Sequence, residues 1–155
     1  MEQWPADLSP EALAKWVEAH FEGTLMGLLE MQVIEVSKER AVVELPFHPG
    51  ITTPSGHVHA GSMVSLADTS ATFAAMAVSG RTVALIDMPV AVSISTQIVG
   101  NIQEGTLRSE STVAHPGRTL MAVTTRITAD GGRLLALVNS SHFIPQSDPH
   151  SGSKE

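Results

Sequence analysis

The pattern of hydrophobic and polar positions predicts one long helix over residues 59–78. Ala, Met and Leu dominate this stretch, and Gly80 stands just beyond it, where a helix commonly ends. Apolar and small side chains recur there at spacings of three and four and form one continuous face, which consists of Met63, Leu66, Ser70, Phe73 and Ala77. We expect this face to pack against the rest of the protein.

A second stripe of the same helix is polar but almost uncharged. It contains Ser65, Asp68, Thr72 and Ser79, and Asp68 is the sole charged residue over positions 46–80. Small polar side chains around one carboxylate are better suited to contact with another protein surface than with bulk water. We therefore expect the helix to be covered on most sides. The alternative is that Asp68 is a solvated residue on an exposed stripe.

Other patterns predict a sheet around this helix. Ser9 and Pro10 favour a short helix over residues 10–21, after a loose segment at residues 1–8. Runs of apolar residues, several of them alternating with polar ones, predict strands at residues 31–37, 40–46, 105–114, 118–129 and 133–144, with one or two more within 82–99, interrupted near Pro89. The strand at 133–144 alternates least, which favours an interior position in the sheet.

Length and composition fit one domain. The chain has 155 residues, of which 43% are hydrophobic, so it is long enough to bury a sizeable core. We expect a helical lead-in at residues 1–22, one α+β domain at residues 23–144 and a disordered tail at residues 145–155. In the domain, the long helix lies across a mainly antiparallel sheet.

Charge and cysteine content exclude several functional classes. The net charge of −7 argues against nucleic acid as a partner. The chain has no cysteine, which excludes a thiol nucleophile and a cysteine-based zinc site. We expect a cytoplasmic protein without a membrane span, because no signal segment opens the chain and the long helix carries a charge and many hydroxyl groups. Several arginines lie in the later half of the chain, and an arginine side chain is well suited to bind a phosphate group. The alternative is that they are ordinary outward-facing residues of strands. They are Arg81, Arg108, Arg118, Arg126 and Arg133.

Two neighbouring motifs carry a resemblance to a known family. Gly56-His57-Val58-His59-Ala60-Gly61-Ser62 is followed by Leu66-Ala67-Asp68-Thr69-Ser70-Ala71. Together they resemble the signature of hotdog-fold acyl-CoA thioesterases of the phenylacetate-degradation (PaaI-like) family, over roughly residues 23–144. The resemblance implies the hotdog fold, hydrolysis of acyl-CoA to free acid and coenzyme A, no cofactor beyond the coenzyme A of the substrate, and a homodimer within a homotetramer.

The resemblance also implies roles for individual residues. Asp68 matches the carboxylate that acts as nucleophile or as general base on water, and the backbone N–H of Ala60 matches the donor that polarises the thioester carbonyl. His59 matches the histidine that positions this loop and the carbonyl, and the acid and the amide come from different chains. Further substrate contacts are expected from Thr53, Ser55, Gly61, Thr69 and Arg118, with Arg118 near the phosphates of coenzyme A.

The sequence departs from the family pattern at two places. Ala60 stands where the family usually has Gly, although the amide is retained, and Thr53 and Ser55 lie near the position where many members have Asn or Gln. Three other interpretations stay open: a hydratase or dehydratase on the same fold, a non-catalytic acyl-CoA-binding protein, and a purely structural His59. His57 and His59 have no clear third partner, so we expect no metal site.

Overall fold

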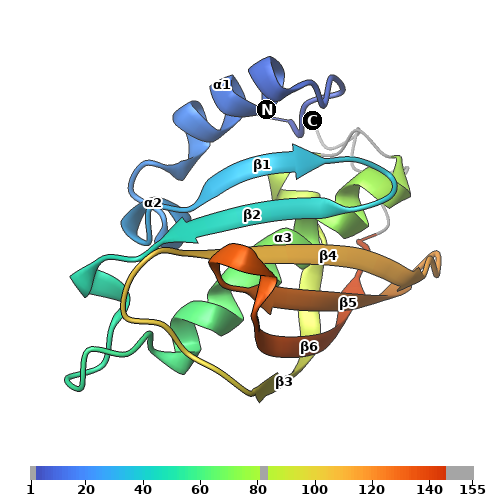
Figure 1. Cartoon of the computed structure of the whole chain (residues 1–155). Helices are drawn as coiled ribbons and strands as arrows, with labels where there is room; N and C mark the ends of the chain where they lie inside the picture. The colour runs from blue at the N-terminus through green and yellow to red at the C-terminus, as the bar shows by residue number, and fades with distance from the viewer. Residues whose placement is uncertain (1–2, 81–83, 146–155) are drawn as a thin grey trace, which may run out of the picture.

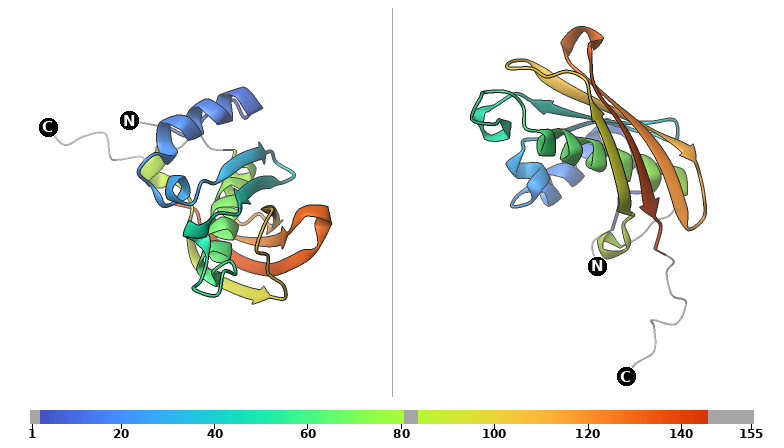
Figure 2. Two further views of the ribbon diagram at one scale, coloured as in Figure 1. Left: turned by 60° about the vertical axis from the view of Figure 1, so that its left-hand side comes forward. Right: turned by 90° about the horizontal axis from the view of Figure 1, so that it is seen from below.

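A computed structural model of the chain describes residues 3–80 and 84–145. In these residues, six antiparallel strands form one curved sheet, and a long helix lies in its concave face (Figures 1 and 2). The strands are β1 (Gln32–Val36), β2 (Ala41–Pro46), β3 (Val90–Ile98), β4 (Thr106–His115), β5 (Leu120–Thr128) and β6 (Leu134–Phe143), in the spatial order β1-β2-β4-β5-β6-β3. The predicted α+β architecture is confirmed.

The long helix α3 (Ala60–Ser79) has the predicted bounds to within a residue. His59 caps its first turn, and Gly80 ends it in the left-handed conformation, at φ 61°, which glycine adopts without a steric penalty. Met63, Leu66 and Phe73 are buried, as the three-and-four spacing predicts, and α3 contacts all six strands. The sheet therefore fixes the position of α3.

A buried cluster of hydroxyl groups joins α3 to the middle of the sheet. The Ser70 hydroxyl lies 2.6 Å from that of Ser109 and 2.7 Å from that of Ser111 on β4. Ser111 in turn lies 2.6 Å from the Thr125 hydroxyl on β5. These paired groups cannot find equal partners after a shift of the helix, so they hold α3 in one register.

The N-terminal segment packs more closely than the sequence indicates. Helices α1 (Pro10–Phe21) and α2 (Leu25–Leu28) precede β1, and α1 contacts it (Figure 1). The expectation of a loose segment at residues 1–8 is wrong for Trp4, which is only 4% exposed. Its ring lies 5.1 Å from that of Phe73 and 5.0 Å from that of Trp16, measured between centroids, and this aromatic contact holds the segment on α3.

The region after α3 also differs in part from the prediction. A single strand, β3, begins after Pro89, and the residues before it form the 3-10 turn η2 (Leu85–Asp87). Strand β6 is interior, as predicted, and lies between β5 and β3. Arg81 and the predicted tail beyond Pro145 lie outside the described residues. In residues 3–80 and 84–145, every helix is too short or too polar to cross a bilayer.

Candidate active site

The segment that leads into α3 folds back on itself in an antiparallel turn. Thr52 and Val58 form an isolated bridge, and the His59 N–H donates to the Ile51 carbonyl at 2.8 Å. The 3-10 turn η1 (Pro49–Ile51) precedes this bridge. The chain therefore reaches the start of α3 from a fixed direction.

The polar side chains of this turn lie together. The Ser55 hydroxyl lies 2.8 Å from that of Thr53 and 3.2 Å from Nδ1 of His57. Ser55 and His57 are exposed, so their remaining hydrogen-bonding capacity faces outwards. The structure thus brings two of the predicted substrate-binding residues into one cluster, with His57 as a third member.

His59 is the N-cap of α3, and its ring has a defined orientation. Nδ1 accepts a hydrogen bond from the Gly61 N–H at 2.8 Å, so the neutral ring carries its hydrogen on Nε2. A Cβ atom on residue 61 would lie 3.0 Å from Nδ1, closer than most such contacts, so glycine gives the ring room to approach. Gly61 therefore positions His59, and its own amide is already engaged.

The amide of Ala60 remains available at the helix N-terminus. Ala60 is exposed and is the first residue of α3, and no acceptor in the described part of the chain is bonded to its N–H. The first N–H groups of a helix lack internal partners and carry the positive end of its dipole. This amide can therefore bind a developing negative charge.

Asp68 lies two turns further along α3 and is half-buried. Its Oδ1 atom is enclosed, and none of the residues that the structure describes forms a hydrogen bond with it. Burial raises the pKa of the Asp68 carboxyl above its usual range, because the charged form loses hydration without gaining a partner. Such a carboxylate is a stronger base than an exposed one.

Asp68 and Ala60 of one chain cannot serve the same carbonyl carbon. Eight residues of helix separate them, which is about 12 Å along the axis at 1.5 Å per residue. Thr69, a predicted substrate contact beside Asp68, directs its hydroxyl to the Ser65 carbonyl at 2.9 Å. The structure therefore gathers Thr53, Ser55, His59, Ala60 and Gly61 at the start of α3 and leaves the acid apart from them.

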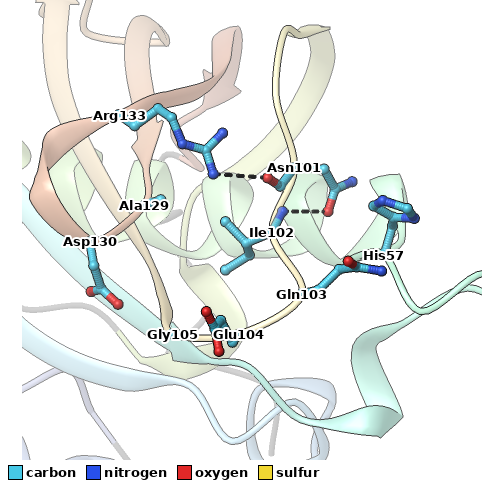
Figure 3. A pocket seen from close by; sticks show the side chains of 9 residues that line it. All are labelled: His57, Asn101, Ile102, Gln103, Glu104, Gly105, Ala129, Asp130 and Arg133. Atoms are coloured by element: carbon cyan, nitrogen blue, oxygen red, sulfur yellow. Dashed lines mark hydrogen bonds between the residues drawn. The ribbon is translucent and has the colours of Figure 1, made fainter.

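Two hollows lie at opposite ends of α3. Arg118 lines a hollow of about 360 Å³ beside Val78 and Ser79, at the C-terminal end. A polar hollow of about 810 Å³ lies at the other end, and Figure 3 shows its lining, which consists of His57, Asn101, Ile102, Gln103, Glu104, Gly105, Ala129, Asp130 and Arg133. Asp68 lines neither, and Arg118 is far from the Ala60 amide of its own chain.

Comparison with known families assigns the chain to a protein superfamily. The family model described as the thioesterase superfamily matches residues 55–136, which include the cap, the amide and the acid. This chain belongs to the thioesterase superfamily. Asp68, His59 and Ala60 thus lie within the part of the superfamily domain that the match covers.

Curated relatives and solved structures are similar to this chain. The inferred esterase ComA2 of Bacillus subtilis (strain 168) is 27% identical over 114 residues, 74% of this chain and 88% of ComA2. Thioesterase HI1161 of Haemophilus influenzae superposes with a TM-score of 0.78 and 16% identity, over 93% of this chain and 96% of HI1161. The hotdog fold is therefore confirmed.

Two further structures concern the expected PaaI-like family and the expected coenzyme A substrate. The Escherichia coli PaaI protein has a TM-score of 0.73 and 19% identity, over 90% of this chain and 97% of PaaI. A hypothetical thioesterase of Streptococcus pneumoniae TIGR4, whose structure contains coenzyme A, has a TM-score of 0.66 and 17% identity, over 76% of this chain and 91% of its own. At these identities the likeness shows the fold, so the PaaI-like assignment within the superfamily stays a prediction.

Proposed function

We propose that this thioesterase-superfamily protein hydrolyses acyl-CoA thioesters to a free acid and coenzyme A, at a site shared by two copies of the chain. The observation that carries the proposal is the half-buried Asp68 carboxylate, whose enclosed Oδ1 atom has no hydrogen bond to the described residues. A buried acid without a partner destabilises a fold, so a catalytic use is the simplest reason for it. The coenzyme A in the streptococcal structure supports the choice of thioester.

Asp68 performs the bond-making step in one of two ways. As a base, it takes a proton from water while the water oxygen attacks the thioester carbon. As a nucleophile, its oxygen attacks that carbon directly and forms an anhydride, which water then hydrolyses. In both routes the tetrahedral intermediate collapses by breaking the C–S bond, and the leaving thiolate of coenzyme A is protonated.

The start of α3 stabilises the charge that develops on the carbonyl oxygen. The Ala60 N–H and the Nε2–H of His59 are not used in the local hydrogen bonds, so both can donate to this oxygen. Thr53, Ser55 and Gly61 shape the loop around the substrate, and Thr69 contacts it near the acid. Arg118 binds the phosphates of coenzyme A from its own hollow.

The second copy docks along β3. This strand is a sheet edge with large apolar side chains exposed, and no described strand pairs with its free edge, whereas α1 contacts β1 at the opposite edge. Antiparallel pairing of two β3 strands about a twofold axis sets the two α3 helices side by side in opposite directions. Asp68 of one copy then approaches the Ala60 amide of the other, and two such dimers form a tetramer.

Thiol release from a panel of short, long and aryl acyl-CoA thioesters tests the proposed function. We expect hydrolysis of at least one of them by the purified protein, with loss of activity in Asp68→Asn. Binding of acyl-CoA without thiol release would instead identify a non-catalytic binding protein. Addition of water to an enoyl-CoA would identify a hydratase.

A further inference from the structure

The side-chain amide of Asn101, in the loop between β3 and β4, pairs with the backbone of Val58. Its Nδ2–H donates to the Val58 carbonyl at 2.9 Å, and its Oδ1 accepts from the Val58 N–H at 2.9 Å. The two residues are 43 positions apart in the chain. Asn101 therefore contacts Val58 in the way that a residue of a neighbouring strand would.

The hydrogen-bond pattern explains why Val58 needs such a partner. The bonds beside its bridge to Thr52 run from His59 to Ile51 and from Thr53 to His57. A residue between two such bonds directs its own N–H and carbonyl to the opposite side of the ladder. Val58 is buried, so both groups would be left unpaired without Asn101.

Asn101 is itself held in place by further hydrogen bonds. Its Oδ1 also accepts from the Ile102 N–H at 2.8 Å, and Arg133 donates to its carbonyl at 3.0 Å; Figure 3 marks both bonds. The Gly100 N–H donates to the Leu135 carbonyl on β6 at 3.1 Å. A Cβ on Gly100 would lie 3.0 Å from the Leu134 carbonyl oxygen, so glycine permits this close approach to β6. Asn101 thus links a rigid interior strand to Val58.

We propose that Asn101 is a positioning residue that holds the Ala60 amide where it meets the thioester oxygen. Val58 precedes the His59 cap directly, so a displacement of Val58 moves both oxyanion donors while Asp68 stays in place on α3. This inference rests on the proposed function. It predicts a loss in kcat with KM largely unchanged, because the donors bond the developing oxyanion more strongly than the ground-state carbonyl.

Asn101→Asp and Asn101→Ala test this role in graded steps. The Asp variant retains the acceptor for the Val58 N–H but sets a carboxylate oxygen against the Val58 carbonyl, and the Ala variant removes both bonds. We expect kcat to fall by about 10–100-fold, a range set by the cost of displacing catalytic groups by about 1 Å. Amide hydrogen exchange over residues 58–61 should become faster. Asn139→Asp, an exposed site on β6, is the control with the same chemical change and should leave kcat and exchange as in the wild type.

The outcomes separate this inference from the proposed function. Folded Asn101 variants with wild-type kcat, or with wild-type exchange over residues 58–61, would overturn the positioning role. If the Ala variant does not fold, the isosteric Asp variant decides by the same two measurements. If the wild type hydrolyses no thioester, the proposed function fails, and exchange alone decides whether Asn101 fixes this loop.

Discussion

At the scale of single residues, the proposed catalytic role of Asp68 has a cost in folding stability. Burial raises the pKa of its carboxyl, so the folded protein binds this proton more tightly than the unfolded chain does. The wild type therefore loses stability as the pH rises from the ordinary range of an aspartate, about 4, through the folded pKa. Below both pKa values the carboxyl is neutral in either state and this loss disappears.

Asp68→Asn is expected to raise the melting temperature at pH 7, because it removes a buried charge and keeps the shape of the side chain. Each kcal/mol added to the free energy of unfolding raises Tm by about 2–4 °C in a chain of this length. The difference from the wild type should shrink as the pH falls below about 4. Thermal unfolding followed by circular dichroism across this pH range measures both, and a variant less stable than the wild type at pH 7 would disprove the unfavourable burial.

The same variant is expected to lose most hydrolysis, by about 100- to 10,000-fold in kcat if Asp68 is a general base. In the wild type, kcat should rise with pH as Asp68 ionises, and this acid limb should lie above the range of an ordinary aspartate. A pH–rate profile of both proteins measures it. Near wild-type turnover in Asp68→Asn would remove Asp68 from the mechanism.

Ala60→Pro tests the oxyanion donor with little change to the fold. Proline lacks the N–H but suits the first position of a helix, and His59 before it has ψ 137°, a conformation that a following proline accepts. We expect an unchanged circular dichroism spectrum and a loss of about 100- to 1,000-fold in kcat, as for removal of one oxyanion donor. Full activity in the folded variant would show that the Ala60 amide takes no part.

Arg118→Ala should raise KM far more than it lowers kcat. Phosphates distant from the reacting carbon contribute binding energy that is common to the ground state and the transition state. Arg126→Ala, which removes an exposed arginine from β5, is the matched control. Equal KM values in the two variants would take Arg118 out of the substrate site.

Sequence could predict some of these residues and not others, for a physical reason. Asp68 stands out as the lone charge in an apolar helix, and His59 and Ala60 belong to the same short segment, where the resemblance to the thioesterase family selects them. Asn101 is an ordinary loop residue by spacing, and its role depends on Val58, which the fold brings to it from 43 positions away. The hydroxyl cluster around Ser70 depends in the same way on pairing between elements.

At the scale of elements, local periodicity predicts α3 and the strands β1, β2, β4, β5 and β6 well. It fails where tertiary contact decides, as at Trp4, which is ordered by aromatic packing on Phe73. It places the interruption near Pro89 correctly but does not predict the 3-10 turn η2, which the apolar residues before Pro89 form. Residues 81–83 lie outside the described part of the chain.

In the proposed dimer, the two copies pair along strand β3, so Val92→Lys should weaken dimer formation. Val92 is 60% exposed on this edge strand, and an added charge opposes pairing of two edges. Leu28→Lys makes the same change at a side chain that is 73% exposed on α2 and should leave the assembly intact. Sedimentation velocity measures both, and a Val92→Lys protein that associates as the wild type does would locate the interface elsewhere.

At the scale of the whole molecule, the proposed catalytic groups of one folded chain lie too far apart to act on the same carbonyl. The donors lie at the exposed start of α3, and the acid lies about 12 Å further along the same helix. In the proposed dimer, twofold pairing along β3 completes two sites at once, since each copy supplies an acid to one and an amide to the other. Catalysis and assembly are then inseparable.

Complementation between two inactive variants tests this shared site most directly. Asp68→Asn and Ala60→Pro chains are refolded together at equal concentrations, and thiol release from the best acyl-CoA substrate is compared with that of each variant refolded alone. Random pairing makes half of the dimers mixed, each with one intact site of two, so we expect about a quarter of the wild-type activity per chain. A mixture that contains mixed dimers and still releases no thiol would mean that the acid and the amide act within one chain.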